Sequence, residues 1–465
     1  MATSNESTAN PSRLRRDLGT LESYAVLIGI LVGAGIFSVT SSATAATGPS
    51  VVLAHLVLAP VILATSVAYL VFLSTPLGLE PGGEVLHIAS TFRSPRLTFL
   101  SAWLKLIAYL GACSFLADVL AANLIELFAP GLNYDGPWLT ALSLATLFGI
   151  LVVHLSGVRW FGRLQVAMCA ILGVSLLVLI VPGLFAVELD NYKPFFTGGA
   201  SGFGAALPSL FFAYAGFEAL SQAAGEVKDS RTKLPRVFVR GILATSAIFI
   251  AMSVVALGVL PASDVGGTQV PMSVAAATYL PWGAEFIVTL GAVMAVATSL
   301  NVSMLVPARL AWHMGREGHL PRAFGQLHAT RSTPSVGLWV SFAIIAALIL
   351  SGQRNLALGI AVVALMLLYT VHSLALIVLP RRNPELYAQT LSRISRPKQL
   401  AAAWSSVLAL ICLVGLRFKG DLERMTSMPL AERAGNLDFT SLELLVAWVV
   451  LGLLLHRWYK RASRT

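Results

Sequence analysis

Long apolar stretches alternate with short polar segments along the whole chain. A helix needs about 20 apolar residues to cross a hydrocarbon core about 30 Å thick. Inside lipid the backbone must satisfy its own hydrogen bonds, which a helix does. The pattern therefore predicts twelve membrane-spanning helices, over residues 21–46, 51–74, 97–128, 137–155, 164–187, 204–225, 238–261, 282–312, 336–351, 354–379, 400–416 and 438–458.

Composition supports this prediction. Of the 465 residues, 56% are hydrophobic and 12% are charged, against about 25% charged in an average soluble domain. The mean hydropathy is +0.78, and a soluble protein of this size needs more polar surface than these residues supply. The three cysteines form neither a disulfide framework nor a metal-ligand spacing. The fold class is therefore an all-α polytopic membrane protein, and no cofactor is indicated.

The positive charge follows the expected topology. The formal net charge is +10, which in a soluble protein would suggest a nucleic-acid partner. Placing the N-terminus inside assigns 26 of the 32 Lys and Arg residues to inner segments and 6 to outer ones. This asymmetry fits the positive-inside rule, so we expect a multi-pass cell-membrane protein with cytoplasmic tails at residues 1–20 and 459–465. The lipid bilayer then accounts for the charge without nucleic acid.

Two predicted spans carry glycine in their middle. The first contains Gly33–Phe37 (GAGIF), and the sixth contains Phe211–Glu218 (FFAYAGFE). Glycine costs about 1 kcal/mol in a helix interior and permits backbone conformations that other residues avoid. A packing seam of small residues is the alternative explanation. If spans 1–5 and 6–10 are two repeats, the breaks fall at matching positions, a pattern that indicates a transporter with a site at mid-membrane.

Several motifs resemble those of the amino acid–polyamine–organocation family of transporters. Gly33–Phe37 resembles the family's G-[SA]-G-I-F signature, and Glu80–Glu84 resembles its P-x-x-G-G-x-Y stretch. The most specific match is Phe212–Glu218 with its exit at residues 225–236. Departures from the usual motifs occur at Val85, Gly225 and Ser230. Further matches in span eight and its exit are Asn301, Arg309, residues 315–321 and Thr333-Pro334.

The resemblance covers residues 18–380 and implies the five-plus-five inverted-repeat fold of the bacterial leucine transporter. The repeats would be residues 21–187 and 204–379, with helices eleven and twelve peripheral in 400–458. In that fold, helices one and six are unwound at the substrate. The resemblance places the substrate carboxylate on backbone groups of Gly33, Ala34, Gly35 and Ile36, and its ammonium end on Phe212, Ala213, Ala215 and Gly216. Phe212 would also be the gate that closes over the substrate.

The resemblance also concerns the coupling ion. Many prokaryotic relatives carry a lysine in span five where sodium sits in other members, but Leu172 stands there. Thr298 and Ser299 match the hydroxyl pair that holds Na⁺ in sodium-coupled relatives, together with carbonyls of Gly29 and Val32. Hydrogen bonding of both hydroxyls to their own helix is the alternative. Our hypothesis is sodium-coupled uptake, with facilitated uptake or exchange next.

Two carboxylates lie at membrane depth, where a charge is expensive and therefore informative. Asp118 in span three either couples protons, contacts a cationic substrate, or pairs with Asn123 or the headgroups. Glu218 directly follows the glycine break and either contacts the substrate or accepts hydrogen bonds from freed N–H groups. At the exit of span six, Glu226 either forms an ion-pair latch with the basic residues of 228–240 or belongs with them to a solvated basic loop.

Other functional classes fit less well. A membrane enzyme needs His or carboxylate side chains that converge from several spans, whereas the eight His are scattered without H-x-x-x-H or H-E-x-x-H spacing. A channel needs rings of polar residues that line a pore, and none is visible. The sequence predicts a secondary transporter and not an enzyme. Its pocket residues are apolar or small, which favours a neutral L-amino acid, with a cationic amino acid or polyamine as the alternative.

Overall fold

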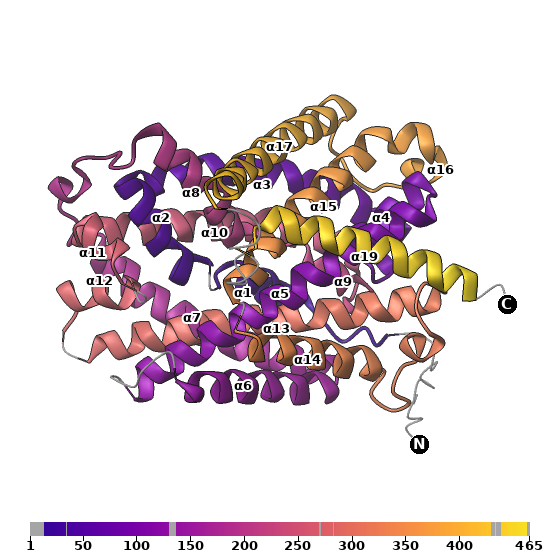
Figure 1. The fold of residues 1–465 in the computed structure, drawn as a ribbon, viewed down its shortest axis with the longest axis horizontal. Coiled ribbons are helices and arrows are strands. Elements are labelled where there is room, and N and C mark those ends of the chain that lie inside the picture. Colours follow the sequence, from indigo (N-terminus) through magenta and orange to yellow (C-terminus); the bar gives the residue numbers. More distant parts are fainter. Residues whose placement is uncertain are drawn as a thin grey trace, which may run out of the picture.

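The computed structural model describes residues 14–33, 35–129, 136–268, 271–281, 283–352, 354–428, 433 and 439–462. Within this part of the chain the secondary structure is helical, and the β-structure it contains is one isolated bridge between Leu18 and Val227. Most of the long helices run along one common direction and form an elongated bundle (Figure 1). The predicted all-α fold class is confirmed.

The first half of the bundle holds α1 (Thr20–Leu31), η1 (Gly35–Val39), α2 (Thr40–Thr47), η2 (Gly48–Ser50), α3 (Val51–Leu73), η3 (Pro76–Leu79), α4 (Gly83–Phe92), α5 (Pro95–Phe128), α6 (Pro137–Leu155) and α7 (Val158–Gly183). The second half holds η4 (Leu189–Tyr192), α8 (Gly199–Tyr214), α9 (Ala219–Gln222), η5 (Ala224–Glu226), α10 (Ser230–Val259), α11 (Ala262–Gly266), α12 (Pro271–Tyr279), α13 (Ala284–Arg316), η6 (Arg322–Gly325), α14 (Ser335–Leu350) and α15 (Arg354–Arg382). The chain ends with α16 (Pro384–Ala388), α17 (Arg396–Ser427) and α19 (Ser441–Ala462).

Each predicted span coincides with a helix or, for spans one and six, with an interrupted pair of helices. Nine helices in the described residues are long and apolar enough to cross a membrane, and α1 and α14 are shorter apolar helices. The chain is therefore a polytopic membrane protein. Some predicted boundaries are wrong: α7 begins at Val158 and α10 at Ser230, so the basic residues of 159–163 and 231–240 lie on first turns of helices and not in loops.

The core lies around α5 and α13, which pack against each other, while α5 also packs against α15 and α13 against α7. The most apolar stretches of α5 and α13 are largely buried, whereas only a third of the residues in those of α6 and α7 are buried. Large apolar side chains are exposed on the outer helices, among them Phe148, Trp160 and Leu177. Exposed apolar side chains on a long apolar helix fit contact with lipid.

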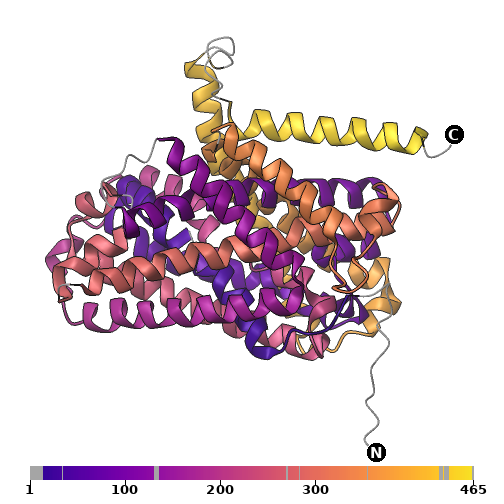
Figure 2. The same cartoon turned by 90° about the horizontal axis from the view of Figure 1, so that it is seen from below.

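The last two long helices lie outside the bundle core, as Figure 2 shows for α19, which runs along one face, and α17, which rises away from it. Trp103 of α5 and Trp448 of α19 anchor this arrangement: their rings stack 4.3 Å apart, and each indole N–H donates to the other's carbonyl, at 2.8 and 3.0 Å. The helix α19 extends to Ala462, so part of the predicted tail 459–465 is helical. Residues 1–13 and 463–465 of the predicted tails lie outside the described residues.

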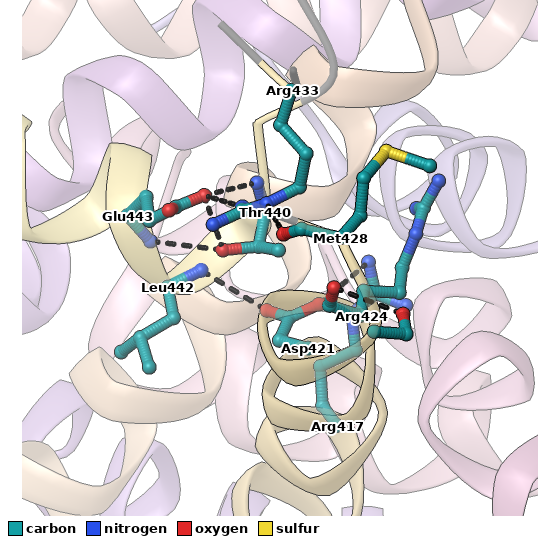
Figure 3. Close-up of polar contacts among 9 residues, drawn as sticks. Arg417, Asp421, Arg424, Met428, Arg433, Thr440, Leu442 and Glu443 are labelled. Atoms are coloured by element: carbon teal, nitrogen blue, oxygen red, sulfur yellow. Dashed lines mark hydrogen bonds and ion pairs between the residues drawn. The ribbon is translucent and has the colours of Figure 1, made fainter. Parts of the chain in front are cut away.

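Charged contacts join the end of α17 to the start of α19 (Figure 3). The guanidinium of Arg433 donates to Glu443 at 2.6 Å, and Asp421 accepts the backbone N–H of Leu442 at 3.0 Å. The helix α17 continues to Ser427, well beyond the predicted end of the span at 416. The predicted span ended earlier because the remaining turns of α17 carry charged residues, which are not typical of a membrane span. These charged side chains pair with α19 and with neighbouring turns of α17.

Candidate functional site

The first span is interrupted where its glycines predicted. The helix α1 ends at Leu31, and the chain continues after a bend as the π-helical turn η1. A Cβ on Gly33 would lie 1.6 Å from Oγ of Ser299, and one on Gly35 would lie 2.3 Å from Cα of Ala213. Glycine is therefore required at both positions, because Gly33 packs against the side chain of Ser299 on α13 and Gly35 against the backbone of Ala213 on α8.

The sixth span is also interrupted at its glycine. The helix α8 ends at Tyr214, Ala215 is extended with φ −71° and ψ 150°, and Gly216 has φ +100°. An L side chain rarely adopts that φ. The helix then restarts as α9, which leaves the backbone groups at both new ends without helical partners. The N–H of Gly216 donates to the hydroxyl of Tyr369 on α15 at 3.2 Å, so a side chain replaces one of the missing backbone bonds.

A small cavity of about 30 Å³ lies between the two breaks. Of the residues that the resemblance assigns to the substrate, it is lined by Gly35, Phe212, Ala213, Ala215 and Gly216. Gly33 packs against Ser299 beside it, Ala34 lies outside the described residues, and the side chain of Ile36 is likewise not described.

The rest of the lining comes from α1, α5, α13 and α15, and includes Ile30, Tyr109, Ser303 and Leu365. The cavity has no charged side chain among its described lining residues. The Phe212 ring meets that of Phe115 edge-on, with centroids 6.0 Å apart, and covers one wall. The arrangement supplies apolar side chains for one part of a ligand and helix-end backbone groups for charged ends.

The hydroxyls predicted for a cation site do reach α1. Thr298 Oγ1 donates to the carbonyl of Gly29 at 2.8 Å, and Ser299 Oγ lies 3.1 Å from the carbonyls of both Gly29 and Ile30. Thr298 also bonds the Ala295 carbonyl of its own helix at 2.7 Å, so the alternative of back-bonding is realised too. Besides the carbonyl of Gly29, Ser299 contacts that of Ile30, whereas the resemblance named the carbonyl of Val32. The two hydroxyls and the carbonyls of Gly29 and Ile30 thus bring several oxygen atoms together between α13 and α1.

Glu218 is fully buried behind the cavity. Its carboxylate accepts hydrogen bonds from the hydroxyls of Tyr109 and Tyr369. The expectation that freed N–H groups would bind Glu218 is therefore wrong: tyrosine hydroxyls are its donors, and the N–H of Gly216 goes to Tyr369 instead. Glu218 holds the break through these rings, because Tyr369 bonds both Glu218 and Gly216.

Asp118 is buried on α5 and is not among the residues that line the cavity. The amide of Asn123 donates to the carbonyl of Val119 at 2.8 Å. Asp118 is therefore not part of the described lining of the site that the two breaks form.

Two buried ion pairs beside the site escaped prediction. Lys105 on α5 bonds Glu84 on α4, with both side chains fully buried, and its ammonium lies 5.5 Å from the ring centroid of Tyr109. Arg309 on α13 bonds Glu226 at 3.1 Å. Glu226 therefore pairs with span eight, and neither the latch with residues 228–240 nor the solvated loop is found at Glu226. Burial raises the pKa of Glu226, and the charge of Arg309 partly offsets this.

The pair of Glu226 and Arg309 belongs to a set of contacts made by the segment that follows the break in the sixth span. Leu18 exchanges backbone hydrogen bonds with the segment after α9, at 3.0 Å to Glu226 and 2.9 Å from Lys228. Gln222 on α9 donates to the carbonyl of Gly82 at 2.9 Å. The part of the sixth span that follows the break is thus held by the segment before α1, by Gly82 at the start of α4 and by α13.

Known proteins show similarity over most of this chain. A family model described as amino acid permease matches residues 18–432. The branched-chain amino acid permease BcaP of Bacillus subtilis (strain 168) is 25% identical over 399 residues, 82% of this chain and 84% of its own length. The methylthioribose transporter of the same strain is 26% identical over 390 residues, 81% and 83% of the two chains. The chloroplastic cationic amino acid transporter 9 of Arabidopsis thaliana is 28% identical over 340 residues, 70% and 59%.

The family match takes in both interrupted helices, the cavity between them and the two buried ion pairs. The relatives named above are permeases or transporters and not enzymes, in agreement with the sequence prediction. The chain belongs to the amino acid permease family, within the amino acid–polyamine–organocation transporters.

Proposed function

We propose that this permease carries a neutral L-amino acid across the cell membrane by alternating access, on a five-plus-five inverted repeat formed by residues 21–187 and 204–379. The observation that carries the proposal is the cavity between two broken helices, whose described lining contains no charged side chain. A zwitterion needs a donor set for its carboxylate and acceptors for its ammonium, which opposed helix ends supply.

In this proposal the carboxylate binds backbone groups of residues 33–36, and the ammonium binds carbonyls of Phe212, Ala213 and Ala215. Phe212 covers the substrate. A cavity of about 30 Å³ does not hold an amino acid, so substrate entry requires the walls to move apart, as alternating access demands. The basic residues orient the protein with both ends of the chain in the cytoplasm.

A cationic substrate is the second candidate, because one relative is named as a cationic amino acid transporter. Against it stands the geometry of Glu218, whose oxygens already accept two tyrosine hydroxyls. Thermal shift of the purified protein with each of the twenty amino acids, polyamines and methylthioribose separates these possibilities. Stabilisation by neutral amino acids supports the proposal, and stabilisation confined to Arg, Lys or polyamines refutes it.

Sodium coupling is part of the proposal and rests on the convergence of the Thr298 and Ser299 hydroxyls with carbonyls of α1. Initial uptake rates into proteoliposomes, measured in sodium and in choline buffer at one pH, provide the test. Thr298→Val keeps the shape of the side chain and removes the oxygen. We expect uptake to depend on sodium in the wild type and to lose that dependence in the variant. Equal rates in both buffers for the wild type rule out sodium coupling.

A further inference from the structure

Two buried side-chain amides pair beside the hydroxyls that meet α1. Gln165 on α7 and Asn301 on α13 are both fully buried, and the Nδ2 of Asn301 donates to the Oε1 of Gln165 at 2.8 Å. Asn301 lies two residues after Ser299, whose hydroxyl reaches the carbonyl of Gly29. Neither amide is among the described residues that line the transport cavity. The pair therefore acts on the helices around it and not on the substrate.

The other end of the Gln165 amide holds α1. Its Nε2 donates to the carbonyl of Ala25 at 3.1 Å. The thiol of Cys169, one turn further along α7, donates to the same carbonyl at 3.2 Å. A carbonyl can only accept, so the nitrogen of the Gln165 amide must face Ala25 and its oxygen must face Asn301. Both polar atoms of Gln165 are thus used, and its orientation is fixed.

These hydrogen bonds form a closed loop through three helices, α1, α7 and α13, that pack on one another in pairs. Asn301 of α13 bonds Gln165 of α7 at 2.8 Å, and Gln165 bonds Ala25 of α1 at 3.1 Å. One turn later in α1, the carbonyl of Gly29 accepts the hydroxyl of Ser299 at 3.1 Å, which returns the loop to α13. The loop fixes the separation of α1 and α13, because neither helix can shift without breaking one of its bonds.

The packing around Gly29 is equally close. A Cβ on Gly29 would lie 2.3 Å from the Nε2 of Gln165, 2.9 Å from the sulfur of Cys169 and 3.0 Å from the Cβ of Thr298. The helices α7 and α13 therefore contact the same residue of α1. The amide of Gln165 lies directly against the residue whose carbonyl accepts the hydroxyls of α13.

We propose that Gln165, held by Asn301, is a positioning residue for the cation site. It keeps the turn of α1 that carries Gly29 at the distance at which α1 carbonyls and α13 hydroxyls bind one sodium ion together. The inference rests on the proposed sodium coupling and gives a role to a side chain outside the ion's own ligand set. Movement of α1 away from α7 and α13 breaks the bond between Gln165 and Ala25, so this bond and the ion site are lost together.

Thermal shift of the purified full-length protein tests the role of Gln165, with sodium alone as the probe. Sodium chloride replaces choline chloride at constant ionic strength, and the readout is the sodium concentration that gives half-maximal stabilisation. Gln165→Met keeps the length of the side chain and removes both hydrogen bonds. Partners that orient metal ligands contribute about 10–100-fold to metal affinity, so we expect this midpoint to rise about tenfold.

Gln399→Met is the matched control. Gln399 is also buried, and its amide donates to the carbonyl of Ile394 at 2.8 Å, but it lies on α17 outside the loop. The control should keep the sodium midpoint of the wild type. Both variants lose buried hydrogen bonds, so a drop in melting temperature in choline is expected of both, and the sodium midpoint separates positioning of the site from general stability.

Asn301→Leu tests whether Asn301 acts through Gln165. This substitution should also raise the sodium midpoint, and combining it with Gln165→Met should cause no further rise, which a double-mutant cycle measures. A wild-type midpoint in Gln165→Met, an equal rise in Gln399→Met, or full addition of the Gln165 and Asn301 effects overturns the inference alone. If a neutral amino acid stabilises the wild type and sodium does not, sodium coupling is refuted and the inference is refuted with it.

Discussion

The buried pair of Glu84 and Lys105 permits a quantitative test of what holds the broken sixth span in place. Glu84 lies in the first turn of α4, close to Gly82, which accepts a hydrogen bond from α9, and Lys105 lies on α5 over the ring of Tyr109. Both side chains are fully buried. We therefore examine the substitutions Glu84→Leu and Lys105→Met, singly and together.

Removing one partner of a buried pair leaves an uncompensated charge and costs about 3–5 kcal/mol, whereas replacing both by apolar residues of similar volume is often neutral. We expect each single variant to lower the free energy of unfolding by about 3–5 kcal/mol and the double variant to recover most of that loss. Among the described residues, the second oxygen of Glu84 has no hydrogen-bond partner. Removing the charge of Glu84 therefore removes the bond to Lys105.

The assay is reversible unfolding in mixed micelles, followed by tryptophan fluorescence and treated as a double-mutant cycle. Lys193→Met is the matched control, because Lys193 pairs with Asp190 at 2.8 Å but the two side chains are 77% and 91% exposed. An exposed pair contributes little, so the control should unfold like the wild type. The reasoning is refuted if the double variant loses as much stability as the sum of the single variants, or if the single variants match the control.

Three further substitutions test the site itself. Gly35→Ala places a Cβ 2.3 Å from Cα of Ala213, and overpacking of this kind costs about 1–3 kcal/mol. We expect uptake to fall about tenfold or more while the circular dichroism spectrum is unchanged. Normal uptake by this variant would contradict the close contact. Tyr369→Phe removes a hydroxyl that bonds Glu218 and the backbone N–H of Gly216. The free energy of unfolding should drop by about 1–3 kcal/mol. An unchanged free energy of unfolding would show that these bonds are dispensable. Phe212→Ala should reduce uptake more than surface expression, measured on the same cells, and unchanged uptake would remove the gate assignment.

The helix breaks could be predicted because their cause is local. Glycines at 33, 35 and 216 interrupt otherwise apolar spans, and the structure places close backbone contacts or a positive φ at each of them. The hydroxyls of Thr298 and Ser299 were also predictable, since adjacent hydroxyls in an apolar helix have few partners other than a neighbouring carbonyl.

The partners of the buried charges could not be predicted, because each pair joins segments far apart along the chain. Glu84 and Lys105 come from different helices, and Glu226 binds Arg309 in preference to the basic residues that follow it in sequence. Counting the charged residues of each segment does not distinguish an arginine that is exposed in a loop from one whose side chain is buried inside the protein. Tyr369 was missed for the same reason: nothing near residue 369 in sequence indicates that its hydroxyl serves Glu218.

The buried pairs of Glu84 with Lys105 and of Glu226 with Arg309 bear on the topology that was inferred from the basic residues. Lys105 and Arg309 were counted among the 26 inner basic residues, and without them 24 remain against 6, so the predicted topology does not depend on them. A buried charge is tolerated at membrane depth when a partner neutralises it, and each of these bases has a carboxylate as its partner. One carboxylate lies beside Gly82, which binds α9, and the other directly follows α9. The segment that follows the break at Gly216 is thus held at its far end by Glu226, which pairs with Arg309, and by Gln222, which bonds Gly82 next to the segment that carries Glu84.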